Sequence, residues 1–82
     1  MKNEILSFLN GSITLNPEIC NGKPTIRGTR ITVQTILEFL SAGDSAEEVL
    51  QQYPSLTLED IKACLQFATM LMSRNYVVKM VA

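Results

Sequence analysis

The side chains that could carry out chemistry are few in this sequence of 82 residues, which contains two cysteines and no histidine. A structural zinc site needs four nitrogen or sulfur ligands at close spacing, whereas Cys20 and Cys64 are two thiols far apart in the chain. Without histidine, a nucleophile would also lack its commonest general base. We therefore predict no catalytic residue, no metal and no cofactor, and expect both thiols to be small buried hydrophobic side chains.

Acidic side chains are concentrated in the middle of the chain. Residues 38–60 contain six acids and no base: Glu38, Asp44, Glu47, Glu48, Glu59 and Asp60. Neighbouring acids on a helix, such as Glu47 and Glu48, point apart and do not form the paired carboxylates that acid-base catalysis uses. We interpret the acids as a solvated surface.

Basic side chains are concentrated just before the acids. Residues 22–30 hold Lys23, Arg27 and Arg30 together with two glycines and a proline, a composition typical of a rigid loop. The loop could bind phosphate groups, with the lysine as a point charge and the arginines as bidentate donors. Alternatively, the arginines pair with the acids of the following helices and hold the loop against them. The sequence leaves both interpretations open.

The elements that must position these charges begin with short extended segments. Residues 12–15 alternate in polarity and residues 24–27 can extend, so we predict that they pair as a small β-ribbon. A turn that contains Asn16-Pro17 and Asn21-Gly22 separates the two segments.

Amphipathic helices follow the ribbon. The first is predicted to begin at the N-cap Thr32 and to end at Gly43. Its apolar face has helical spacing: Val33, Ile36, Leu37 and Leu40. The second begins with a capping box of Ser45 and Glu48 and stops before Pro54.

A third helix is predicted to begin at the N-cap Thr57. Its expected buried face comprises Leu58, Ile61, Leu65, Ala68 and Met72. The predicted fold class is therefore mainly α, a trihelical helix-turn-helix-like bundle with a small N-terminal β-ribbon. Residues 1–11 would form a leader or arm, residues 12–73 a single domain, and residues 74–82 an apolar tail.

The second and third helices have the lengths of a helix-turn-helix, in which the later helix enters the major groove of DNA. The exposed stripe of the third helix is expected to be polar: Lys62, Gln66, Thr69 and Ser73. Glu59 and Asp60 at the start of this helix oppose binding to phosphates. Binding of DNA by this stripe together with the basic loop is therefore one hypothesis among others.

The C-terminal tail is apolar and β-branched. Its candidate partner-binding residues are Tyr76, Val77, Val78, Met80 and Val81. Because so many apolar side chains rarely stay together in water, we expect a partner chain to cover them by strand addition or groove docking. The alternative is that the tail extends the third helix or pads a dimer core.

The size of the chain bears on its assembly and location. A core this small gives limited stability, and the β-prone ribbon would leave an unpaired edge, so we predict a homodimer. No stretch approaches the roughly 20 apolar residues of a membrane span, and no secretory signal is recognisable. We therefore predict a cytoplasmic protein that does not bind membranes.

A longer string of residues resembles a known family. The matching positions are Asn16-Pro17-Glu18-Ile19-Cys20, Gly22-Lys23-Pro24, Ile26-Arg27-Gly28-Thr29-Arg30, Val33, Leu37, Gly43, Tyr53-Pro54-Ser55-Leu56 and Asp60-Ile61. With them the sequence resembles the small prokaryotic domain-of-unknown-function family 433. The resemblance implies a winged or ribboned trihelical fold without catalytic residues. It also implies the role proposed for several members, a VapB-like antitoxin encoded beside a PIN-like ribonuclease toxin.

This chain departs from the family at Asn21, where members often carry histidine, so the resemblance implies no metal or base role there. The leading interpretation is a non-enzymatic, dimeric, antitoxin-like protein that binds a cognate toxin and touches operator DNA. The rivals are a stand-alone DNA-binding regulator and a protein-binding adaptor.

Overall fold

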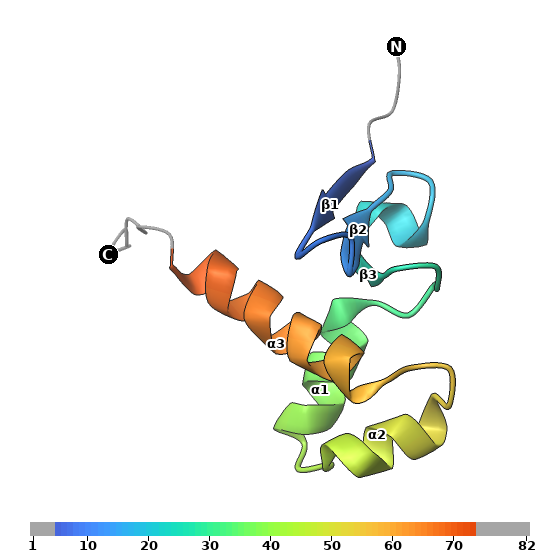
Figure 1. Cartoon of the computed structure of the whole chain (residues 1–82), viewed down its shortest axis with the longest axis vertical. Coiled ribbons are helices and arrows are strands. Elements are labelled where there is room, and N and C mark those ends of the chain that lie inside the picture. The colour runs from blue at the N-terminus through green and yellow to red at the C-terminus, as the bar shows by residue number, and fades with distance from the viewer. Residues whose placement is uncertain (1–4, 74–82) are drawn as a thin grey trace, which may run out of the picture.

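The computed structural model describes residues 5–73, which form a small antiparallel sheet followed by three helices (Figure 1). The predicted fold class, a helix-dominated protein with a small N-terminal sheet, is confirmed. The elements in chain order are β1 (Leu6–Phe8), β2 (Ile13–Leu15), the 3-10 turn η1 (Cys20–Gly22), β3 (Thr25–Ile26), α1 (Val33–Ser41), α2 (Ala46–Gln52) and α3 (Leu58–Met72).

β2 is the central strand of the sheet, with β1 and β3 antiparallel on either side. Pairing of β2 with β3 confirms the predicted ribbon, in which Ile13 lies opposite Ile26. β1 comes from the segment predicted as a leader or arm. Its Phe8 lies opposite Ile13 and stacks edge-on against Phe67 of α3, with ring centroids 5.3 Å apart. The leader is therefore tied into the fold by a strand and an aromatic contact.

The predicted helix boundaries are confirmed by the capping groups. The side chain of Thr32 accepts a hydrogen bond from the Thr35 amide, and Gly43 follows the C-cap of α1 with φ +107°. α2 and α3 both begin with a capping box. In α2 it joins Ser45 to Glu48. In α3 it joins Thr57 to Asp60. Each box satisfies two amide donors that the first helical turn would leave free.

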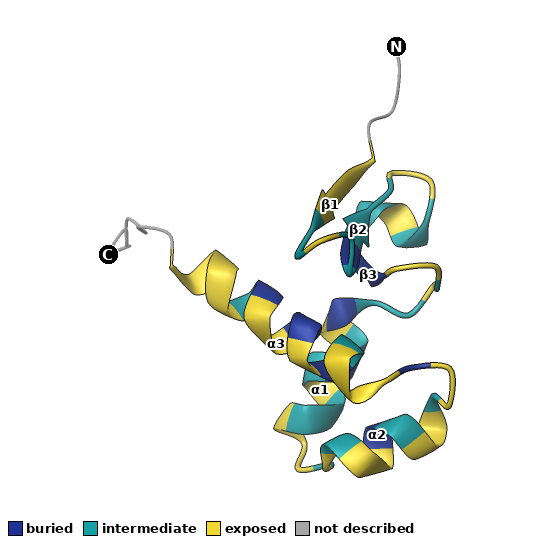
Figure 2. Ribbon diagram, in the orientation of Figure 1, coloured by how far each residue is buried: buried dark blue, intermediate teal, exposed yellow. Residues whose placement is uncertain are grey.

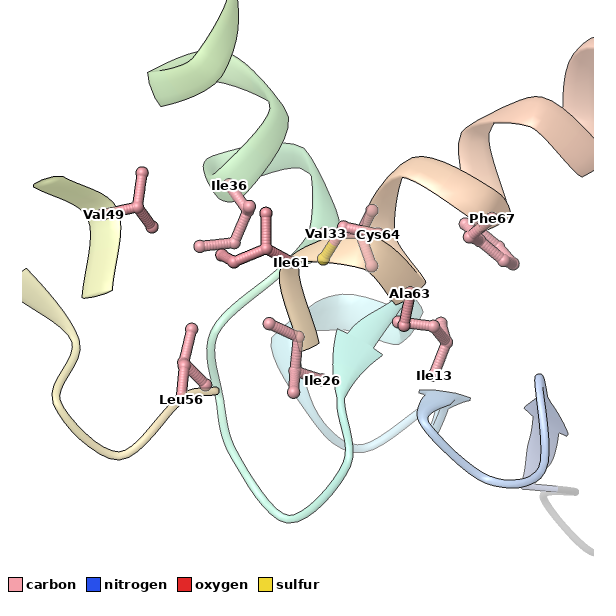
Figure 3. Packing of buried hydrophobic residues seen from close by; sticks show 10 residues of the cluster. All are labelled: Ile13, Ile26, Val33, Ile36, Val49, Leu56, Ile61, Ala63, Cys64 and Phe67. Carbon is pink, nitrogen blue, oxygen red and sulfur yellow. The ribbon is translucent and has the colours of Figure 1, made fainter. Parts of the chain in front are cut away.

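The core lies where the sheet, α1 and α3 meet. Its buried members are Ile13, Ile26, Val33, Ile36, Val49, Leu56, Ile61, Ala63, Cys64 and Phe67. Figure 3 shows their side chains, with Val49 and Leu56 toward one end of the cluster and Phe67 toward the other. The sheet and the helices therefore share one core.

The predicted buried face of α3 is partly wrong. Ile61 is buried as expected, but Leu58, Leu65 and Met72 are exposed, and the core positions are instead Ala63, Cys64 and Phe67. The helix has apolar side chains on more than one side, so periodicity alone does not select the inward face. Contact with β2 determines which side of α3 is buried, because α3 packs on the sheet as well as on α1.

Within residues 5–73, no helix has the length and apolar character needed to cross a bilayer.

Candidate binding surfaces

An open, mainly apolar groove of about 610 Å³ runs between α1 and α3. Val33 and Phe67, two of the core side chains drawn in Figure 3, also line it. Within residues 5–73, the lining comprises Pro24, Val33, Gln34, Leu37, Glu38, Ser41, Phe67, Ala68, Leu71 and Met72. The amide of Val33 donates to the Pro24 carbonyl at 2.9 Å, which fixes the start of α1 beside the end of the ribbon. The groove is thus built on rigid elements.

The electrostatics of the groove are simple, because Glu38 is the one charged residue among the described residues that line it. Glu38 is exposed and accepts a hydrogen bond from the Gln34 side chain at 3.2 Å. From Ile31 to Ile61 the chain contains no lysine or arginine. The groove therefore combines an apolar surface with an acidic rim, in a region that carries no positive charge of its own.

The six acids are exposed or half-buried, as predicted for a solvated surface. Two of them serve as caps. Glu48 accepts from the Ser45 amide at 2.7 Å, and Asp60 accepts from the Thr57 amide at 2.9 Å. Their carboxylates therefore help to start helices.

The basic loop presents Lys23, Arg27 and Arg30 to solvent. Within the described part of the chain the only ion pair joins Lys62 to Glu59, so the arginines do not pair with the acids of α1 and α2. The loop is instead held by Thr29. The hydroxyl of Thr29 donates to the Ile26 carbonyl at 2.7 Å and accepts from the Ile31 amide at 3.0 Å. The cationic groups are thus free to bind an external ligand.

The polar stripe of α3, defined as Lys62, Gln66, Thr69 and Ser73, is exposed as expected. Lys62 lies 3.7 Å from the Glu59 carboxylate, and the hydroxyls of Thr69 and Ser73 donate to carbonyls of their own helix. Among residues 5–73, no hydrogen bond or ion pair links this stripe to the basic loop. The two halves of the predicted DNA-binding surface are therefore separate features of the structure.

The two cysteines differ in environment, so the prediction that both thiols are buried is confirmed for Cys64 but not for Cys20. Cys64 is fully buried, and burial raises the pKa of its thiol to about 11, with a smaller contribution from the negative charge of Asp60. Cys20 is half-buried, and its sulfur donates to the Arg30 carbonyl at 3.2 Å. Both are free thiols. No group of three potential metal ligands occurs between residues 5 and 73.

The predicted partner-binding tail, Tyr76, Val77, Val78, Met80 and Val81, lies outside the described residues. The groove, in contrast, is a candidate site that sequence reasoning missed. Its walls come from residues assigned to ordinary helix faces, and only the packing angle of α3 on α1 turns them into a depression. No sequence signal except the surplus of apolar residues in α3 could have indicated it.

These features define a class of small, helix-dominated protein with an N-terminal ribbon, a helix-turn-helix-like arrangement and candidate binding surfaces. A family model described as a protein of unknown function, DUF433, matches residues 13–68. The chain therefore belongs to the DUF433 family, which confirms the resemblance seen in the sequence.

Two relatives extend this comparison. The uncharacterized protein y4eO of Sinorhizobium fredii (strain NBRC 101917 / NGR234) is 38% identical over 56 residues, which are 68% of this chain and 25% of y4eO. The crystal structure of a DUF433 member from Anabaena variabilis ATCC 29413 is 36% identical, with a TM-score of 0.70 over 72% of this chain and 58% of that one. This chain thus spans a quarter of y4eO and somewhat more than half of the Anabaena protein.

Proposed function

We propose that this chain is a non-enzymatic, cytoplasmic, antitoxin-like protein whose groove between α1 and α3 binds a PIN-like ribonuclease toxin. The observation that carries the proposal is the groove itself. It exposes apolar surface next to the buried core, and two core side chains, Val33 and Phe67, form part of its lining. An exposed apolar depression with a polar rim is typical of a protein-binding surface. Neutralising a toxin needs affinity and no chemistry, which suits this inventory of side chains.

The charge of the region supports the choice of partner. The rim of the groove carries Glu38, and residues 31–61 hold acids without a single base. Proteins that bind RNA present basic surfaces to its phosphates. A helix of the ribonuclease with one apolar face and basic flanks would match both the groove and its rim.

The proposal is tested by co-expressing this chain with the tagged product of the neighbouring open reading frame, which the proposal expects to be a PIN-like ribonuclease. We expect the two proteins to co-purify and RNA cleavage to be suppressed. Glu38→Arg, which reverses the charge of the rim, is expected to weaken the complex by about tenfold or more. Leu71→Asp places an unpaired carboxylate in the apolar wall and should weaken it further.

The matched control is Glu47→Arg, which reverses another exposed acid outside the groove lining. It is expected to leave affinity nearly unchanged. Absence of a complex with the wild-type chain would contradict the proposal, as would equal losses for Glu47→Arg and Glu38→Arg.

Operator DNA is a second candidate ligand, favoured by the exposed cations of the basic loop. In electrophoretic retardation of the promoter fragment, Arg27→Glu with Arg30→Glu should abolish binding, while Lys62→Ala should reduce the salt slope by about one unit. Because neither arginine has an ion pair within residues 5–73, circular dichroism should show an intact fold. Unfolding of the double variant would assign the arginines a structural role.

A further inference from the structure

Besides its polar stripe, α3 carries an exposed apolar stripe that is not part of the buried core, defined as Leu58, Leu65 and Met72. The exposed fractions of these residues are 49%, 47% and 68%. They follow one another at intervals of seven residues, or about two helical turns, and therefore lie along one line of the helix. Figure 2 shows exposed residues along the length of α3. Apolar residues at this spacing are the pattern by which one helix packs against another.

The stripe is symmetric about its middle residue. Leu65 lies seven positions from Leu58 and seven from Met72, so the outer apolar residues are equally spaced from the centre. A two-fold axis requires a self-complementary surface, in which residue i of one copy meets residue j of the other and the reverse. Antiparallel pairing about Leu65 meets this requirement, because Leu58 of each copy then faces Met72 of the other.

The distribution of charge along α3 also favours antiparallel pairing of two copies. Glu59 and Asp60 lie in its first turn, and after Lys62 the helix has no charged residue up to Arg74, which follows the C-cap Ser73. A parallel pair would set the acids of one copy against those of the other. An antiparallel pair sets them beside a helix end that has no acid, which avoids this repulsion.

We propose that the apolar stripe of α3 is the docking surface for a second copy of this chain, forming an antiparallel dimer centred on Leu65. The dimer was expected on general grounds from the small core and the free ribbon edge, and this surface replaces that edge as the interface. The proposal stands independently of the toxin. It assigns Leu58, Leu65 and Met72 to self-association. Met72 also lines the groove, whereas Gln34, Leu37 and Glu38 of the α1 wall are not part of the stripe and remain available to another partner.

The first test compares two surfaces by sedimentation equilibrium at micromolar concentration. We expect the wild-type chain to have twice the monomer mass of 9.1 kDa. Leu65→Lys places two like charges at the two-fold axis and should raise the dissociation constant by about 100-fold or more. The matched control is Leu6→Lys on the outer strand β1, where the leucine is also 49% exposed. This variant should remain dimeric.

A second test examines the direction of pairing. Leu58→Glu and Met72→Lys should each weaken the dimer, and the two together should restore it, because antiparallel pairing sets each new glutamate against a new lysine. Parallel pairing would oppose like charges and leave the double variant monomeric. A monomeric wild-type chain, a dimer lost in Leu6→Lys but kept in Leu65→Lys, or a double variant without recovery would each overturn the proposal. Circular dichroism of every variant checks the fold.

Discussion

α1 and α3 differ in how they use their apolar residues. In α1 all large apolar side chains are buried or half-buried, and the outward positions hold polar residues such as Gln34 and Glu38. α3 buries Ile61, Cys64 and Phe67, yet it also exposes leucine and methionine on other sides. The fold of a single chain thus buries the apolar residues of α1 at least in part, but leaves several of those of α3 exposed. These exposed apolar residues of α3 contribute to the groove and form the surface of the proposed dimer.

The largest expected effect comes from comparing the inner and outer sides of α3. Phe67→Ala removes a buried ring that contacts Phe8 and should lower the free energy of unfolding by about 3–5 kcal/mol. Leu58→Ala on the outer side should change it by less than about 0.5 kcal/mol. Urea denaturation of both variants in the Leu65→Lys background measures these differences without a contribution from self-association. Similar losses at the two positions would refute the assignment of the two sides.

The buried thiol of α3 makes the second prediction. The pKa of Cys64 is about 11 in the folded chain against an ordinary value of about 9, so the unfolded chain loses this proton first as pH rises. The stability that comes from the neutral thiol is fully present below pH 9 and is lost between pH 9 and 11. The expected loss is about 3 kcal/mol at most. Urea denaturation across this range should show a shallower decline for Cys64→Ala, and an unchanged decline would contradict the prediction.

The capping groups of the two helices give the smallest expected effect. Thr57 caps α3 in a box with Asp60, and Thr32 caps α1 through the Thr35 amide. Thr57→Ala and Thr32→Ala should each lower the free energy of unfolding by about 1 kcal/mol. The control Thr57→Ser keeps the hydroxyl and should cost only a few tenths of this. If Thr57→Ser were as damaging as Thr57→Ala, the hydrogen bond to the Asp60 amide would not be the stabilising contact.

The bounds of the helices could be predicted from the sequence because their signals are local. Thr32, Ser45 and Thr57 each bond an amide three residues further along, so the capping contact depends on nearby residues alone. The pairing of β2 with β3 was also predictable from two extended segments around one turn. The family followed from residues 16–61, a string specific enough to be matched without any structure.

Long-range contacts decided the rest. The strand in residues 6–8 is too short to signal itself, and it exists because Phe8 meets Phe67, 59 positions away in the chain, while its backbone pairs with β2. The buried side of α3 could not be predicted from its periodicity, because apolar residues with helical spacing occur on two sides of the helix. Contact with the sheet determines which of the two sides is buried.

The candidate site divides in the same way. The composition of the basic loop and the acidity of residues 38–60 were determined by the sequence, and their exposure followed from the cost of burying charge. Whether Arg27 and Arg30 pair with those acids could not be predicted from the sequence, and in residues 5–73 the structure shows no such ion pair. The groove is formed by the packing of α3 on α1, which the sequence does not reveal. A local pattern fixes which groups a segment carries, whereas the packing of distant segments fixes which of those groups remain free to bind.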